Sequence, residues 1–187
     1  MMNAQIDDML SELEKISGDA NKTFANLRAE QINWRPPGEG WSVGQCFEHM
    51  IKTNSLFFPV LEQIERGEYR NSFWQNYSPL SSFFGNLLIK SLQKDERKFK
   101  APTEKIVPPS EIDARVVETF SAHQREMIDR LRRAAGGKAD WQKTVITSPF
   151  MKLMTYKLSD GVRIVVEHEK RHVRQAERVM REAGFPK

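Results

Sequence analysis

The chain has 187 residues, a length that suits one domain with a substantial buried core, and we predict a single domain over residues 1–187. Its 29 Lys and Arg only slightly exceed its 25 Asp and Glu, and the two signs are interleaved, which is typical of solvated helix faces rather than of a nucleic-acid surface. An acidic start, the lack of any apolar run near ~18 residues, and a lone cysteine, Cys46, argue against a signal peptide, a membrane span and an internal disulfide, and predict a soluble cytoplasmic protein.

Four segments show the apolar recurrence of long helices, and none shows the alternation of a strand, so the sequence predicts an all-α fold. The first segment has apolar residues at three- and four-residue steps from Ile6 to Leu27 and ends before Pro36. The third is expected to begin at Ser110, a candidate cap, and to end at 136–137, where two glycines follow one another.

The second and fourth segments carry the candidate site. The second is expected to begin at Ser42, which with Gln45 forms a candidate capping box, and to run to about Arg66 with a kink at Pro59. The fourth is expected over residues 159–184.

Two long connections join these segments. Residues 67–109 are too many for a structureless loop, and we expect a short amphipathic helix at 83–92 followed by an extended return. Residues 138–158 are expected to lie across one end of the bundle. The arrangement that we predict is a four-helix up-down bundle with a long crossover between the second and third helices.

The fourth segment contains His168-Glu169-Lys170-Arg171-His172, which fits the zinc-protease pattern H-E-x-x-H. Histidines four apart lie on one helix face, and here they fall on the apolar stripe that should be buried. A protease of the extended form would need glycine at Gln175 and histidine at Arg178, and neither is present. A third metal ligand must therefore come from upstream.

Two histidines remain upstream as candidate ligands. His49 lies two turns inside the second helix on an expected inward stripe, whereas His123 lies off its helix's apolar stripe beside charged residues. We therefore expect His49 to complete the site and His123 to lie at a wet surface.

Two motifs carry a resemblance to a known family. Residues 41–49, Trp-Ser-Val-Gly-Gln-Cys-Phe-Glu-His, resemble the W-S-x(6)-H segment of the DinB/YfiT-like superfamily, and residues 168–175 resemble its H-x-x-x-H segment on the last helix. The resemblance extends over nearly the whole chain. It implies a metal-binding four-helix bundle in which His49, His168 and His172 hold a divalent ion, commonly nickel or zinc, and it makes a homodimer an expectation.

The function that we expect is a metal-dependent small-molecule enzyme of the thiol-transferase type, with a low-molecular-weight thiol as co-substrate. Three neutral imidazoles leave the charge of the ion undiminished, so a thiol or water at an open position would become more acidic. The alternatives are a metal-dependent hydrolase and a non-catalytic, stress-related metal-binding protein. A small-molecule substrate is expected, and neither nucleic acid nor a membrane is an expected partner.

Other side chains near these motifs are given lesser roles. We expect Glu169 to be an exposed bystander, Cys46 to be a small buried thiol, and Gln175 to be a hydrogen-bond partner for an imidazole. The tryptophans at 34, 41 and 74 are expected to pack in the core, with one of them as a candidate wall of the pocket.

Overall fold

The computed structural model describes residues 4–38, 40–73, 75, 81–94, 103–137, 139–151 and 153–187. Most of the described residues are helical, which confirms the all-α class in outline. In chain order the elements are α1 (Ala4–Phe24), α2 (Ala29–Asn33), α3 (Val43–Ser55), α4 (Phe58–Glu65), α6 (Ser81–Leu92), the 3-10 helix η1 (Glu104–Ile106), α7 (Val116–Gly136), β1 (Val145–Thr147), β2 (Thr155–Lys157) and α8 (Leu158–Met180). No helix within these ranges is long and apolar enough to cross a membrane.

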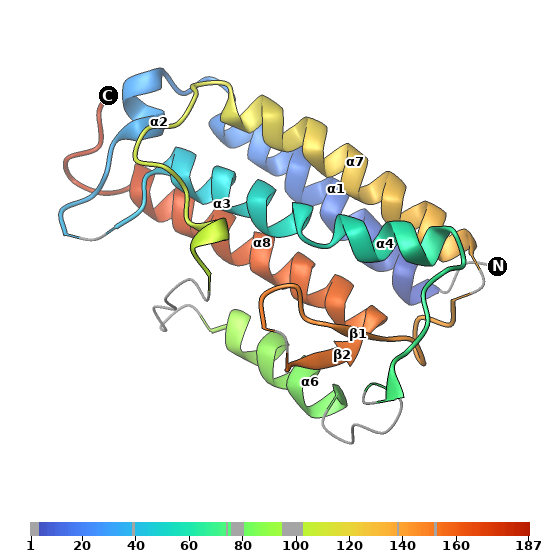
Figure 1. Ribbon diagram of the computed structural model, residues 1–187. Helices are drawn as coiled ribbons and strands as arrows, with labels where there is room; N and C mark the ends of the chain where they lie inside the picture. The colour runs from blue at the N-terminus through green and yellow to red at the C-terminus, as the bar shows by residue number, and fades with distance from the viewer. Residues whose placement is uncertain are drawn as a thin grey trace.

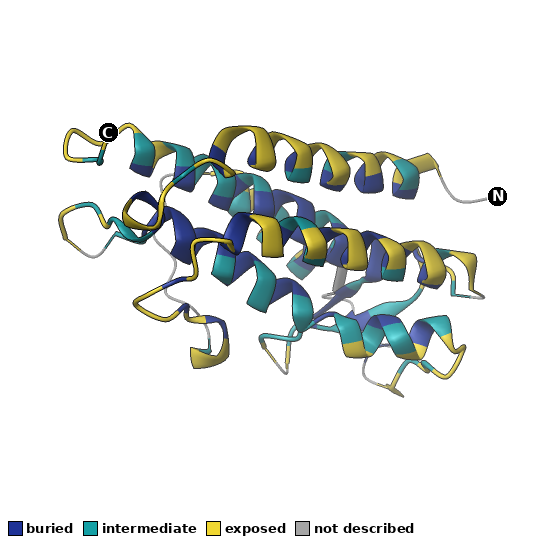
Figure 2. Cartoon of the chain, turned by 90° about the horizontal axis from the view of Figure 1, so that it is seen from above, coloured by how far each residue is buried: buried dark blue, intermediate teal, exposed yellow. Residues whose placement is uncertain are grey.

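The long helices pack lengthwise against one another (Figure 1). On one side α1 contacts α7 and α8, and on the other α3 contacts the same two helices. Figure 1 shows α1 and α8 running in one direction and α3, α4 and α7 in the other. Their buried sides face inward (Figure 2). The largest fully buried side chains include Phe24, Phe47, Phe120, Tyr156, Met9 and Leu13.

The helix that begins at Ser42 forms as expected and is then interrupted. The Ser42 hydroxyl accepts a hydrogen bond from the Gln45 backbone N–H at 3.1 Å, and the Gln45 side chain accepts one from the Ser42 N–H at 3.1 Å. Pro59 lies in the first turn of α4, where its missing N–H removes no helical hydrogen bond. The predicted kink is thus a complete break between α3 and α4.

The predicted start of the third long helix at Ser110 was wrong. The side chain of Asn33 donates to the Ile112 carbonyl at 2.9 Å and accepts from the Ile112 N–H at 2.8 Å. This amide pairing satisfies both backbone groups of Ile112 outside a helix, and α7 begins only at Val116. The helix ends at Gly136, as expected.

The first segment is also divided in two. The helix α1 ends at Phe24, and α2 begins after Arg28, whose backbone N–H donates to the Gln31 side chain at 2.9 Å. The short α2 ends at Asn33, before Pro36. The apolar recurrence therefore marked the right residues but not the break between them.

An antiparallel hairpin of β1 and β2 was not expected from the sequence. Ile146 pairs with Tyr156, and both side chains are fully buried. They pack on Gly161 of α8, where an added Cβ would lie 3.1 Å from an atom of each. The connection therefore covers the start of α8 with a small sheet because Gly161 leaves room for these side chains.

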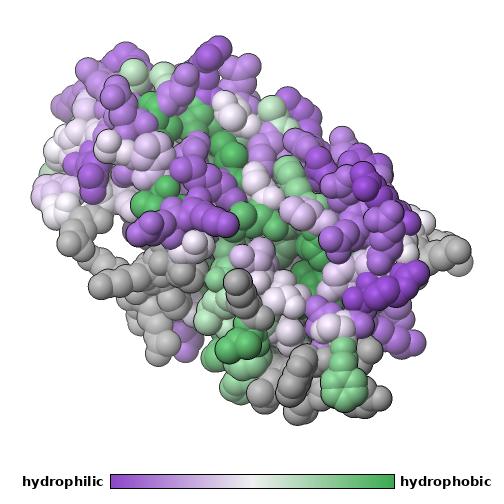
Figure 3. All heavy atoms as spheres, viewed as in Figure 1, coloured by the Kyte–Doolittle hydropathy of each residue, from purple (hydrophilic) through white to green (hydrophobic). Residues whose placement is uncertain are grey.

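The helix α6 lies outside the long helices and packs against α8 and β2. It confirms the short helix expected at 83–92, although Phe83 and Leu87 on its outer side stay exposed. The preceding Trp74 and part of the extended return, residues 95–102, lie outside the described residues. On the face drawn in Figure 3, hydrophilic residues cover most of the helix surfaces and hydrophobic ones lie between them.

Candidate metal centre

His49 is held in one orientation by the end of the crossover. It lies two turns inside α3 and is 4% exposed. Its Nδ1 atom lies 2.8 Å from the carbonyl oxygen of Ile106 in η1. A carbonyl oxygen only accepts, so Nδ1 carries the hydrogen and Nε2 of the neutral ring keeps its lone pair. This is the arrangement that orients an imidazole for a metal.

The structure brings His168 and His172 to the same place. The Nε2 atoms of His49 and His168 lie 3.1 Å apart, and the ring centroids of the three histidines lie 4.5 to 5.0 Å from one another. One nitrogen from each ring falls within 4.8 Å of the other two. His49 and His172 are buried, whereas His168 is partly exposed.

The geometry of the cluster fits a divalent ion. Ligand nitrogens at ~2.0–2.1 Å from a tetrahedral zinc ion lie roughly 3.4 Å from one another, close to the separation of His49 and His168. The Nδ1 atoms of His168 and His172 are buried and have no hydrogen-bond partner among the described residues. The contact between the Nε2 atoms of His49 and His168 has the length of a hydrogen bond, and a divalent ion shared by the three rings would account for all of them meeting at one place.

The surroundings keep all three rings neutral. Burial lowers the pKa of His49, an effect opposed by its hydrogen bond to Ile106. Burial also lowers the pKa of His168 and of His172 well below the usual value, and the neighbouring histidines and Arg171 lower both further. Neutral imidazoles offer their lone pairs to a cation, so the site is prepared for a metal without a cost of deprotonation near neutral pH.

Trp41 forms a wall of the histidine cluster. Its ring centroid lies 4.7 Å from that of His49, and it stacks on His172 at 5.8 Å and 20°. The hypothesis that a tryptophan walls the site therefore agrees with the position of Trp41. Trp34 instead packs edge-on against Phe185 near the chain's end.

Glu169 is not the exposed bystander that we expected. It is fully buried, and its carboxylate oxygens accept hydrogen bonds from Asn54 at 2.6 Å and Gln124 at 2.5 Å. Burial raises the pKa of Glu169 to about 8, and the two hydrogen bonds oppose that rise. The expectation was wrong because α8 is packed between α1, α3 and α6, and because Gln124 of α7 reaches Glu169 across the core.

The remaining candidates are distributed around this centre. Cys46 is a buried thiol as expected, and burial raises its pKa to about 12. Burial lowers the pKa of His172, and Gln175, the expected hydrogen-bond partner, only weakly opposes that effect. His123 does not join the cluster, but the expectation of a wet surface was wrong in part: its Nε2 lies 2.9 Å from the Ser55 hydroxyl, and its ring stacks on Phe58.

Sequence reasoning missed the groups that support the ligands. The Ile106 carbonyl leaves no signal in the sequence, because any residue has a backbone carbonyl. Asn54 and Gln124 did leave one, since each is a polar residue on the buried side of a helix, where a hydrogen-bond partner is required.

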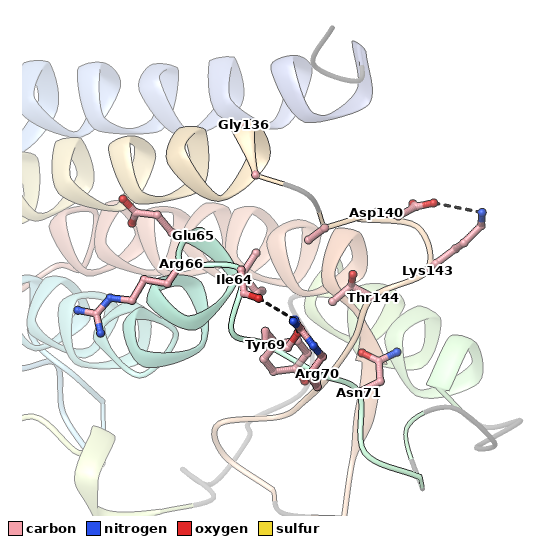
Figure 4. A pocket seen from close by; sticks show the side chains of 13 residues that line it. Ile64, Glu65, Arg66, Tyr69, Arg70, Asn71, Gly136, Asp140, Lys143 and Thr144 are labelled. Carbon is pink, nitrogen blue, oxygen red and sulfur yellow. Dashed lines mark hydrogen bonds and ion pairs between the residues drawn. The ribbon is translucent and has the colours of Figure 1, made fainter.

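A polar concavity lies where α4 and α7 end, and none of the three histidines lines it (Figure 4). Its cations already have partners: Lys143 pairs with Asp140 at 3.3 Å, and Arg66 with Glu62. Arg70 donates to the carbonyl oxygen of Gly67 at 2.7 Å. We therefore place the candidate site at the histidines.

Comparison with known proteins agrees with the motifs. The family model of the DinB superfamily matches residues 12–176, and the chain belongs to this superfamily. No curated protein and no solved structure matches it. The matched residues contain all three histidines of the cluster.

Proposed function

We propose that His49, His168 and His172 hold a divalent ion, nickel or zinc, and that the protein is a metal-dependent enzyme of the thiol-transferase type. The observation that carries this proposal is the convergence of three neutral imidazole nitrogens within 4.8 Å. Structural zinc sites are usually closed by four ligands and rich in cysteine. A set of three histidines leaves a position for a reacting ligand.

The residues around the cluster support a role in chemistry. When bound, the ion would supply a Lewis-acid position that lowers the pKa of a thiol or of water. His49 is oriented by Ile106, and Trp41 covers one side of the cluster. His168 is partly exposed, which gives a small substrate a side from which to approach.

The transfer itself would need few groups from the protein. A low-molecular-weight thiol gives its proton to solvent, its sulfur forms a bond to an electrophilic carbon of the small-molecule substrate, and the leaving group departs with the electron pair. The chain's residues would bind and orient the two reactants and exclude competing water.

Several coarser expectations belong to the same proposal. We infer a single domain over residues 1–187, in which α1, α3 with α4, α7 and α8 form an up-down four-helix bundle with its crossover between α4 and α7. A cytoplasmic location and a homodimer complete it.

Metal analysis tests the proposal first. Purified protein is stripped with chelator, reconstituted with nickel or zinc, and compared with His49→Ala and His172→Ala, with His123→Ala as the matched control. We expect about one ion per chain in wild type and in the control, and much less in the other two variants. Equal metal contents in all four proteins would refute the site.

A substrate screen of the loaded protein follows. Thiols paired with electrophiles, and a panel of esters, are compared with free metal at the same concentration. Thiol-dependent turnover supports the transferase, ester turnover alone replaces it with the hydrolase, and turnover of neither leaves a metal-binding protein.

A further inference from the structure

We propose that Glu169 is a positioning residue for the metal centre, because its carboxyl group sets how α8 sits against α3. These two helices carry all three histidines. The inference rests on the proposed function, in that it takes His49, His168 and His172 as the ligands.

One buried carboxyl group joins the long helices. Its Oε1 accepts from Asn54 of α3 at 2.6 Å and its Oε2 accepts from Gln124 of α7 at 2.5 Å. The Gln124 amide also donates to the Leu13 carbonyl of α1 at 3.4 Å. Asn54, Gln124 and Glu169, the carboxyl cluster, are all fully buried. The carboxyl cluster therefore ties α8 to the other three long helices at a single point.

The carboxyl cluster and the histidines lie on the same stretch of the same two helices. Glu169 follows His168 directly and precedes His172 by three residues. On α3, Asn54 comes five residues after His49, about 7.5 Å along the helix axis. A slip of α8 by one residue would move its side chains by about 1.5 Å and 100°. Such a slip would break the Asn54 hydrogen bond and separate Nε2 atoms that now lie 3.1 Å apart.

The chemistry of the carboxyl cluster suits positioning better than stabilisation. Burying a carboxyl group and two amides costs free energy that hydrogen bonds only offset, and apolar residues of similar volume often stabilise a core equally well. Apolar contacts have no preferred direction, however, whereas two hydrogen bonds to one carboxyl group fix both the height and the rotation of α8. A polar cluster beside the histidines is explained if the metal centre needs the height and rotation of α8 to be fixed.

The test separates positioning from stability. An apolar variant, Asn54→Leu with Gln124→Leu and Glu169→Leu, removes the carboxyl cluster. Glu169→Gln keeps the length of the side chain and bridges the same two residues once the Asn54 amide turns, so that its Oδ1, which has no partner among the described residues, accepts from the new NH2 group. Leu131→Ala, a fully buried position on α7 outside the carboxyl cluster, serves as a control for lowered stability. Each protein is loaded with Co²⁺ after chelation; its affinity is measured by competition, its ligand geometry by the visible absorption spectrum, and its folding by circular dichroism.

We expect the apolar variant to fold cooperatively but to bind Co²⁺ about 10- to 100-fold more weakly, with an altered spectrum. Glu169→Gln and Leu131→Ala should resemble wild type in affinity and spectrum. If the apolar variant keeps the wild-type affinity and spectrum, the inference is overturned. If Glu169→Gln loses as much Co²⁺ affinity as the apolar variant, the hydrogen bonds from residue 169 to Asn54 and Gln124 are not what positions the helices. If the apolar variant does not fold, Asn54→Leu, which removes the hydrogen bond between α3 and α8, is judged by the same criteria. Failure of wild type to bind Co²⁺ would instead refute the proposed function.

Discussion

The Nε2 atoms of His49 and His168 lie 3.1 Å apart, although 119 residues separate them in the chain. An ion that binds both stabilises the folded state, because the unfolded chain does not hold the two rings together. At a free metal concentration of 100 times Kd, the gain is about 2.7 kcal/mol. For a chain of this length, we expect nickel or zinc to raise the Tm by roughly 5–10 °C. Differential scanning calorimetry measures it, and a similar rise in His168→Ala would contradict the prediction.

The metal-free protein should lose stability in mild acid. The three histidines of the cluster have a lowered pKa, so below about pH 6.5 the unfolded chain binds protons that the folded protein does not. The contribution of the neutral histidines to the free energy of unfolding is fully present above that pH and is lost as the pH falls. Glu169 acts in the opposite direction, since its raised pKa makes its contribution fall as the pH rises from about 4.5 to about 8.

Because the histidines and Glu169 change the stability in opposite directions with pH, the experiment compares wild type with a variant of one histidine. Urea unfolding with chelator is measured at several pH values for wild type and His168→Asn. The wild type's advantage over the variant should shrink as the pH falls below 6.5. A difference that does not change with pH would show that the folded protein does not depress the pKa of His168.

Trp41 should report metal binding by fluorescence. Its ring lies 4.7 Å from that of His49, so a bound paramagnetic ion such as Cu²⁺ or Ni²⁺ should quench its emission. We expect Trp41→Phe to lose most of the quenching seen in wild type, and Trp141→Phe, which alters a buried ring before β1, to retain it. Undiminished quenching in Trp41→Phe would place the ion elsewhere.

Cys46 should be chemically inert in the folded protein. It is fully buried, and its pKa of about 12 leaves almost no thiolate at neutral pH. Ellman's reagent should therefore react slowly with native protein and with one thiol per chain in guanidinium. Cys46→Ala should retain its metal, whereas rapid native labelling or loss of metal in that variant would give the thiol a direct role.

Replacing each of two glycines with alanine should change the free energy of unfolding in opposite directions. A Cβ on Gly44 would lie 2.7 Å from the Ile32 side chain and 3.0 Å from the Ile32 carbonyl, whereas a Cβ on Gly18 would meet nothing within 4 Å. We expect Gly44→Ala to lower the free energy of unfolding by about 1–3 kcal/mol despite a better helix propensity. Gly18→Ala should raise it by roughly 0.5–1 kcal/mol. Urea denaturation measures both free energies of unfolding. If both variants change it in the same direction, Ile32 can move aside to make room for the added Cβ.

The sequence predicted the ligand helices well because their signals are local. Ser42 and Gln45 lie three residues apart, and the His168–His172 pair repeats the period of one helix. His49 was selected because it is a polar residue on the expected inward stripe of its helix, where its side chain needs a binding partner. These arguments selected the three histidines that the structure brings together, and their binding of a metal stays a prediction.

The features that sequence reasoning missed depend on contacts between distant segments. The late start of α7 follows from Asn33, 79 residues before Ile112, and the hairpin follows from the space above Gly161. The burial of Glu169 depends on how many helices surround α8, which its own periodicity does not encode. Local patterns specify an element and one of its faces, but they do not say how many neighbours it will have.

The distance along the chain between His49 and His168 has a consequence for folding. Bringing both rings to one ion closes a loop of about 120 residues, and by the chain-entropy estimate used for disulfides such a closure costs an unfolded chain about 5 kcal/mol. Before α8 docks, only the local His168–His172 pair is available to the metal. Tight metal uptake should therefore occur late in folding, and a chain that retains its ion would be one whose last helix has already closed onto the others.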